Sequence, residues 1–140
     1  MKLKSNFMNN KTRKLIVITS LVYLLMSGLI LTFIPQEIAL FFLSETPNIL
    51  ILAFQLLGAL YLGFGVMNYF KKNSLIGGIY NRPLVFGNFL HFLVGSFALI
   101  KMLGNYSENA LNVILLVSII YSLLTICFGY LLINNPIKTK

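Results

Sequence analysis

Residues 15–34 form an apolar stretch, LIVITSLVYLLMSGLILTFI, that carries no charge over 20 positions and ends at Pro35. A helix of about 20 apolar residues is long enough to cross the hydrocarbon core of a bilayer. Membrane-spanning strands would alternate apolar and polar residues, which this stretch does not do. We therefore predict a transmembrane helix. Because the stretch is longer than the apolar part of a signal peptide and no small-residue cleavage pattern follows it, we expect it to remain in the protein.

Three further apolar stretches follow, over residues 49–70, 83–103 and 110–133. The chain of 140 residues is 58% hydrophobic, and only 10% of its residues are charged. Soluble domains carry roughly a quarter charged residues, because they must present a hydrated surface. The sequence therefore predicts one all-α domain, a polytopic membrane four-helix bundle in contact with a lipid bilayer.

The basic residues are distributed unevenly around these stretches. Ten of the 11 Lys and Arg residues precede the first stretch, separate the second from the third or follow the fourth, and only Lys101 lies at the opposite ends. By the positive-inside rule this distribution predicts that both termini face the cytoplasm, an N-in/C-in topology. The net charge of +8 is confined to the ends of apolar stretches, so it does not indicate a nucleic-acid partner.

A short helix is expected over residues 36–43, on the outer side between the first two stretches. Pro35 suits the first position of a helix, and Glu37 suits the positive N-terminal end of the helix dipole. The remaining residues are apolar, so this helix would lie in the membrane interface or cover the mouth of the bundle. A plain hydrophobic connector is the alternative interpretation.

Few residues are available for chemistry. The chain has no Asp, and its only acids, imidazole and thiol are Glu37, Glu45, Glu108, His91 and Cys127. A single cysteine excludes an intrachain disulfide and a cysteine-based zinc site, and we predict no metal site. Coupled ion transport and hydrolysis need charged groups or an activated nucleophile within the spans, and no such constellation is present. The sequence therefore predicts no catalytic residues and favours a non-enzymatic protein, without deciding the question.

Small residues in the second and third stretches are expected to form helix contact faces. Helices in lipid associate through close packing of small residues, because lipid removes the hydrophobic drive between them. The small residues concerned are Gly58, Ala59, Gly63 and Gly65 in the second stretch and Gly87 and Gly95 in the third. The pattern leaves open whether they contact another helix of the chain, a second copy in a homo-oligomer or a different membrane protein.

Polar residues within the spans form the most informative set. Amide and imidazole groups are costly in hydrocarbon unless they are paired, and a rise of about 1.5 Å per residue places three tyrosines at the depth of the histidine, near the midplane. The set comprises Tyr23, Gln55, Tyr61, Asn88, His91 and Tyr121. It is either a structural layer in which these groups satisfy one another, or a site for a lipophilic ligand with a polar head, such as a quinone. Haem is a weaker alternative, since one histidine offers one axial ligand, and no motif indicates a cofactor.

Three segments of the spans carry a family resemblance: GLILTFIP at residues 28–35, QLLGALYLGFG at residues 55–65 and RPLVFGNFLH at residues 82–91. The chain resembles small uncharacterised bacterial four-helix integral membrane proteins, which are DoxX-like in their general look. These segments carry the resemblance, and it extends in outline over most of the chain. The resemblance implies a multi-pass protein of a bacterial-type inner cell membrane. It also implies a subunit of a quinone-linked redox system. This function is the alternative to the one that the residues themselves favour, which is helix packing and assembly or the holding of a lipophilic ligand at mid-membrane.

Overall fold

The computed structural model describes residues 10–43, 46–73, 82–105 and 108–133, and every regular element in these ranges is a helix. The terminal residues 1–9 and 134–140, which carry four of the bases used for the topology prediction, lie outside the described part of the chain. The sidedness of the protein in the membrane accordingly stays a prediction.

Four long helices match the four predicted spans. They are α1 (Asn10–Phe33), α3 (Asn48–Lys71), α4 (Arg82–Met102) and α5 (Glu108–Ile133). Each is long and apolar enough to cross a membrane, which confirms the all-α fold class with four spans. A 3₁₀ turn, η1 (Leu103–Asn105), follows α4. The first helix begins five residues before its predicted start because Lys and Arg are good helix formers, so the helix need not stop where the apolar stretch does.

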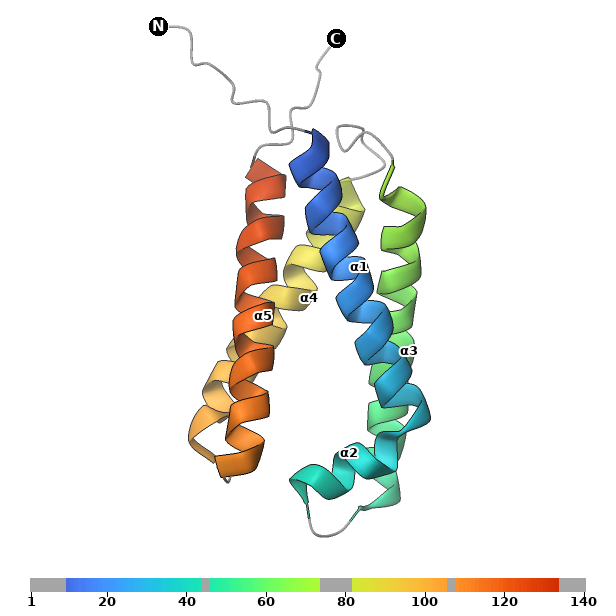
Figure 1. Cartoon of the computed structure of the whole chain (residues 1–140), viewed down its shortest axis with the longest axis vertical. Coiled ribbons are helices and arrows are strands. Elements are labelled where there is room, and N and C mark those ends of the chain that lie inside the picture. The colour runs from blue at the N-terminus through green and yellow to red at the C-terminus, as the bar shows by residue number, and fades with distance from the viewer. Residues whose placement is uncertain (1–9, 44–45, 74–81, 106–107, 134–140) are drawn as a thin grey trace, which may run out of the picture.

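The short outer helix is also present, as α2 (Pro35–Phe42). It begins at Pro35, one residue earlier than expected, and Glu37 lies in its first turn. It ends at Phe42, and the following residue, Leu43, has an extended backbone and donates its N–H to the carbonyl of Ala39 at 2.9 Å. Ala39 is fully buried, and α2 contacts both α1 and α3, so it lies across their ends as Figure 1 shows.

The four long helices are arranged as two packed pairs. Helix α1 packs along α3, and α4 packs along α5, whereas the contacts of α1 with α5 and of α3 with α4 are far fewer. Figure 1 shows the pairs close together at the end where α1 begins and α5 ends, which we call the basic end. They diverge toward the opposite end, which we call the α2 end. The four long helices therefore form two pairs that diverge from the basic end.

Glycine allows α1 and α3 to touch through their backbones. A Cβ atom added to Gly58 would lie 2.9 Å from the carbonyl oxygen of Gly28 and from the backbone nitrogen of Thr32. A Cβ atom on Gly65 would lie 2.7 Å from a methyl carbon of Leu25. Side chains at these positions would force the helices apart, because such distances are well inside van der Waals contact.

The other small residues of α3 point elsewhere. Ala59 and Gly63 are exposed, and a Cβ atom added to Gly63 would meet no atom within 4 Å. Successive helical residues are rotated by about 100°, so these two positions cannot share the face that Gly58 and Gly65 present to α1. They form no helix contact face within the described chain, and a contact with a second copy or another membrane protein stays a prediction.

The second pair is packed through glycine and aromatic rings. The ring of Tyr121 covers Gly95 so closely that a Cβ atom there would overlap it, and a Cβ atom on Gly129 would lie 3.2 Å from the ring of Phe89. Fully buried Phe92 stacks on Phe128 with 5.7 Å between ring centroids. These rings form the centre of the α4–α5 interface.

The two glycines of α3 provide a matched test of this packing. Gly58→Leu should lower the free energy of unfolding by about 1–3 kcal/mol, the usual cost of overpacking, because its side chain would collide with the backbone of α1. Gly63→Leu, which adds the same side chain to an exposed position of the same helix, should change stability little. Thermal unfolding in detergent measures both, and equal losses for the two variants would show that α1 does not approach α3 at Gly58.

Candidate functional site

The four mid-depth residues that sequence analysis singled out meet in the structure, one from each long helix. Tyr61 of α3 and Tyr121 of α5 are hydrogen-bonded through their hydroxyls, and the Tyr121 hydroxyl lies 3.3 Å from Nε2 of His91 in α4. The ring of Tyr23 in α1 meets the ring of Tyr121 edge-on, with 5.9 Å between centroids. We call these four residues the tyrosine–histidine cluster.

Aromatic rings fix the orientation of His91 within this cluster. Its imidazole stacks on Phe64 at 5.3 Å between centroids, and it meets the edges of Tyr61 and Phe92, each at 5.1 Å. A hydroxyl hydrogen can rotate, and a neutral imidazole has one donor and one acceptor nitrogen, so the chain Tyr61–Tyr121–His91 can point its hydrogen bonds in either direction. The cluster therefore forms a continuous hydrogen-bonded path from α3 through α5 to α4.

A second polar group lies nearer the basic end and joins three helices. The side-chain amides of Asn68 in α3 and Asn88 in α4 exchange two hydrogen bonds, of 3.0 and 2.9 Å. The second N–H of Asn68 donates to Oγ of Ser20 in α1 at 3.1 Å, and that of Asn88 donates to the carbonyl of Leu84 at 2.9 Å. All four amide N–H groups and both amide oxygens are therefore paired. We call Ser20, Asn68 and Asn88 the amide cluster, and all three side chains are fully buried.

Sequence analysis included Asn88 but missed Asn68. The signal was present, because Asn68 is an amide within an apolar span and lies on the same helical face as Gly58, Tyr61 and Gly65. These four positions follow the helical spacing of three and four residues that marks one buried face. Tracing that face from the glycines would have led to Asn68.

Gln55 behaves differently from the rest of the predicted polar layer. Its side chain is exposed, and it lies on α3 closer to the α2 end than Tyr61 does. The preceding residue, Phe54, is half-buried, which places Gln55 beside the buried face rather than on it. Gln55 therefore belongs to neither cluster.

The predicted packing glycines of α4 border the tyrosine–histidine cluster. Gly95 lies beneath the ring of Tyr121, as described above, and a Cβ atom on Gly87 would make an ordinary 3.4 Å contact with the ring of Phe64. Both glycines thus lie next to rings that contact His91.

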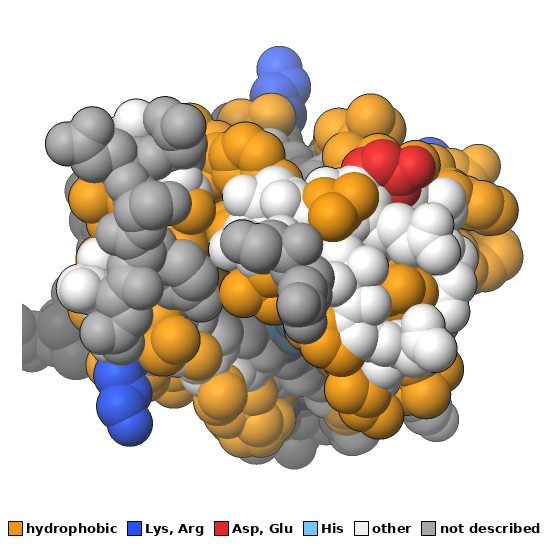
Figure 2. All heavy atoms as spheres, turned by 90° about the horizontal axis from the view of Figure 1, so that it is seen from below, with side chains coloured by type: hydrophobic (Ala, Val, Ile, Leu, Met, Phe, Trp, Pro, Cys, Tyr) orange, Lys and Arg blue, Asp and Glu red, His pale blue; other side chains and the backbone are white. Residues whose placement is uncertain are grey.

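A cavity of about 610 Å³ ends on this cluster. Tyr23, Ser27 and Tyr61 provide polar groups at mid-depth, and Ser27 is hydrogen-bonded to the Tyr23 side chain. Glu37 of α2 contributes a carboxylate at the α2 end. Figure 2, a view of the molecule from below, shows acidic side-chain atoms among hydrophobic ones on this face. The rest of the lining is apolar: Ile30, Leu31, Ile38, Phe41, Phe42, Leu57, Val113 and Val117.

The cavity lies between the two helix pairs and is open to its surroundings. Its walls come from α1, α2 and α3 on one side and from α5 on the other, where Figure 1 shows the pairs diverging. Three of the wall residues, Ile30, Phe41 and Val113, are 43%, 53% and 40% exposed. The cavity is therefore accessible from outside the protein along these wall residues.

The arrangement restricts the chemistry that the site can perform. Among the described residues, no group of three His, Cys, Asp or Glu side chains could hold a metal ion. Nε2 of His91 is in contact with Tyr121, so axial ligation of a haem iron through that nitrogen would have to break this contact. The tyrosine and serine side chains of the cavity can form hydrogen bonds to the polar head of a molecule, and the apolar side chains can contact the rest of it.

The amide cluster can be tested by a double-mutant cycle. In Asn68→Leu the oxygen of Asn88 loses its only donor, so we expect a loss of about 1–2 kcal/mol, at the upper end for hydrogen bonds in membranes. Asn88→Leu should behave alike, and the double variant should lose clearly less than the sum. Unfolding by denaturing detergent measures the cycle, with exposed Gln55→Leu as the control, and strictly additive losses would contradict the pairing.

No family model, curated protein or solved structure matches this chain.

Proposed function

We propose that this protein holds a lipophilic ligand in the cavity between its helix pairs, with the polar head of the ligand at the tyrosine–histidine cluster. The observation that carries the proposal is the placement of Tyr23, Ser27 and Tyr61 at mid-depth in a cavity whose remaining lining is apolar except for Glu37. Ligand sites commonly combine apolar walls with a few polar groups that fix orientation. This cavity has that composition.

The size and depth of the cavity favour a head group with an attached chain. A volume of about 610 Å³ falls within the usual range for small-molecule sites, roughly 300–1,000 Å³. Apolar residues such as Leu31, Leu57 and Val117 would contact the chain, while the hydroxyls of Tyr23 and Ser27 are able to donate to a carbonyl. A quinone has this combination of a carbonyl-bearing ring and an apolar tail.

One observation favours a second candidate, a subunit of a quinone-linked membrane redox system. Tyr61 lines the cavity, and its hydroxyl begins the hydrogen-bonded path to Tyr121 and His91. Such a path is able to carry a proton to or from a ring oxygen when a quinone in the cavity changes its redox state. The electrons would come from a partner protein, since the chain offers no redox centre among its described residues.

The proposal is tested by extracting and identifying what co-purifies with the protein in its own lipid. We expect a quinone, or another lipid with a compact polar head, to be enriched over its share of the surrounding bilayer in mass spectra of the extract. The double variant Tyr23→Phe/Ser27→Ala should retain about tenfold less, because it removes two hydrogen-bond donors from the cavity. Leu57→Trp should also expel the molecule, because the larger ring occupies the cavity.

The control is Tyr69→Phe, which removes the same hydroxyl from an exposed tyrosine of α3. It should leave retention unchanged. If no molecule is enriched with the wild-type protein, or if all variants retain it equally, the cluster is a structural layer and the protein acts through packing alone.

A further inference from the structure

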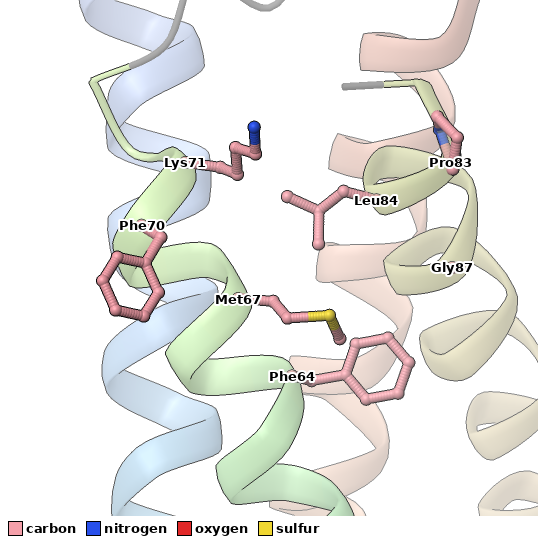
Figure 3. A pocket seen from close by; sticks show the side chains of 7 residues that line it. All are labelled: Phe64, Met67, Phe70, Lys71, Pro83, Leu84 and Gly87. Carbon is pink, nitrogen blue, oxygen red and sulfur yellow. The ribbon is translucent and has the colours of Figure 1, made fainter. Parts of the chain in front are cut away.

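A second hollow lies between α3 and α4 at the basic end, and it shares no residue with the cavity described above. It has a volume of about 410 Å³, and its walls are apolar except at Lys71. Phe64, Met67 and Phe70 contribute from α3, and Leu84 and Gly87 from α4. In Figure 3, Lys71 extends from the end of α3 toward α4, above Met67 and Leu84. We call this hollow the α3–α4 groove.

We propose that the α3–α4 groove binds an anionic phospholipid, with its phosphate at Lys71 and an acyl chain between the two helices. The groove combines a cation at the end of a membrane span with an apolar floor directly below it. An anionic phospholipid likewise has a charged head group at the membrane surface and an apolar acyl chain directly below it. Ammonium groups at this depth attract anionic head groups.

Among the residues whose side chains the structure describes, no acid lies at this end beside Lys71. All three glutamates of the chain occur at the α2 end of the sequence pattern: Glu37 in α2, Glu45 between α2 and α3, and Glu108 at the start of α5. Arg82, the exposed first residue of α4, adds a second cation next to Pro83 in the groove wall. An anion that enters the groove therefore meets Lys71 and, within the described part of the chain, no acidic lining residue.

The neighbouring lysine is directed elsewhere. Nζ of Lys72 lies 3.6 Å from the centroid of the Tyr69 ring, a cation–π contact, and Lys72 does not line the groove. Two adjacent lysines thus have different surroundings, and only Lys71 combines its charge with the apolar floor. This difference supplies a matched control for any effect of overall charge.

The width of the groove depends on Gly87. A Cβ atom there would make only an ordinary contact of 3.4 Å with the ring of Phe64, so a side chain is tolerated sterically but would extend into the space between the helices. Gly87→Ile should therefore fill the apolar floor without disrupting the helix contact. The binding of a free phosphate ion should not change in this variant, whereas an acyl chain would be excluded from the groove.

The proposal is tested by native mass spectrometry and thermal unfolding of the full chain in detergent. The probes are phosphatidylglycerol, phosphatidylcholine with the same acyl chains, and inorganic phosphate. We expect phosphatidylglycerol to bind and to raise the unfolding temperature more than phosphatidylcholine does, and inorganic phosphate to have no effect. Lys71→Gln should weaken phosphatidylglycerol binding about fivefold, the usual contribution of one basic side chain, whereas Lys72→Gln should weaken it much less.

Gly87→Ile should reduce the binding of phosphatidylglycerol while its own unfolding temperature without lipid stays close to that of the wild type. Equal losses in Lys71→Gln and Lys72→Gln would show general charge attraction and overturn the site. Stabilisation by inorganic phosphate alone would assign the groove to a free anion instead. Because neither Lys71 nor Lys72 lines the cavity, the outcome of their comparison leaves the proposed function untouched.

Discussion

The requirement that polar side chains in hydrocarbon find partners within the protein determines how the two helix pairs are joined. Within each pair, contact rests on glycine: Gly28 against Gly58 in one, and Gly95 beneath Tyr121 in the other. Between the pairs, Asn68 is hydrogen-bonded to Asn88, and Tyr61 is hydrogen-bonded to Tyr121. Unpaired amides and hydroxyls at this depth are costly, so these links hold the pairs in one register.

The position of the links accounts for the shape of the molecule. Asn68 lies seven residues from Tyr61 along α3, about 10 Å, so the amide cluster and the tyrosine–histidine cluster both lie between the basic end and mid-depth. Beyond them toward the α2 end, the pairs diverge. The cavity occupies the space that opens there, and α2 contributes Glu37 and Phe41 to its wall.

The sequence predicted well how deep a residue lies in the bundle, but less well in which direction its side chain points. Counting residues from the ends of the spans placed Tyr23, Tyr61, His91 and Tyr121 at one level, since helical rise is nearly constant, and the structure brings these four together. Counting does not determine which way a side chain points. Gln55, Ala59 and Gly63 were chosen for residue type and spacing, and all three face outward because the buried face of α3 is set by its packing on α1.

The divergence of the pairs could not be predicted from any single span. It depends on where polar residues of different helices meet, and one of these, Asn68, looks in sequence like an isolated amide near the end of an apolar stretch. The cavity and the α3–α4 groove follow from the same tertiary contacts. Of their lining residues, the sequence singled out only Tyr23 and Tyr61, and most of the others are apolar side chains whose sequence positions carry no sign of a binding site.

Whether the pairs diverge can be measured directly by distances between spin labels on α3 and α4 in a Cys127→Ser background. Labels at Leu52 and Phe97 report the α2 end, and labels at Val66 and Phe86 report the basic end; all four positions are exposed. In lipid nanodiscs we expect the distance between Leu52 and Phe97 to be clearly longer than that between Val66 and Phe86. Equal distances at the two ends would mean a parallel bundle without the opening between the pairs, and would contradict the proposed ligand site.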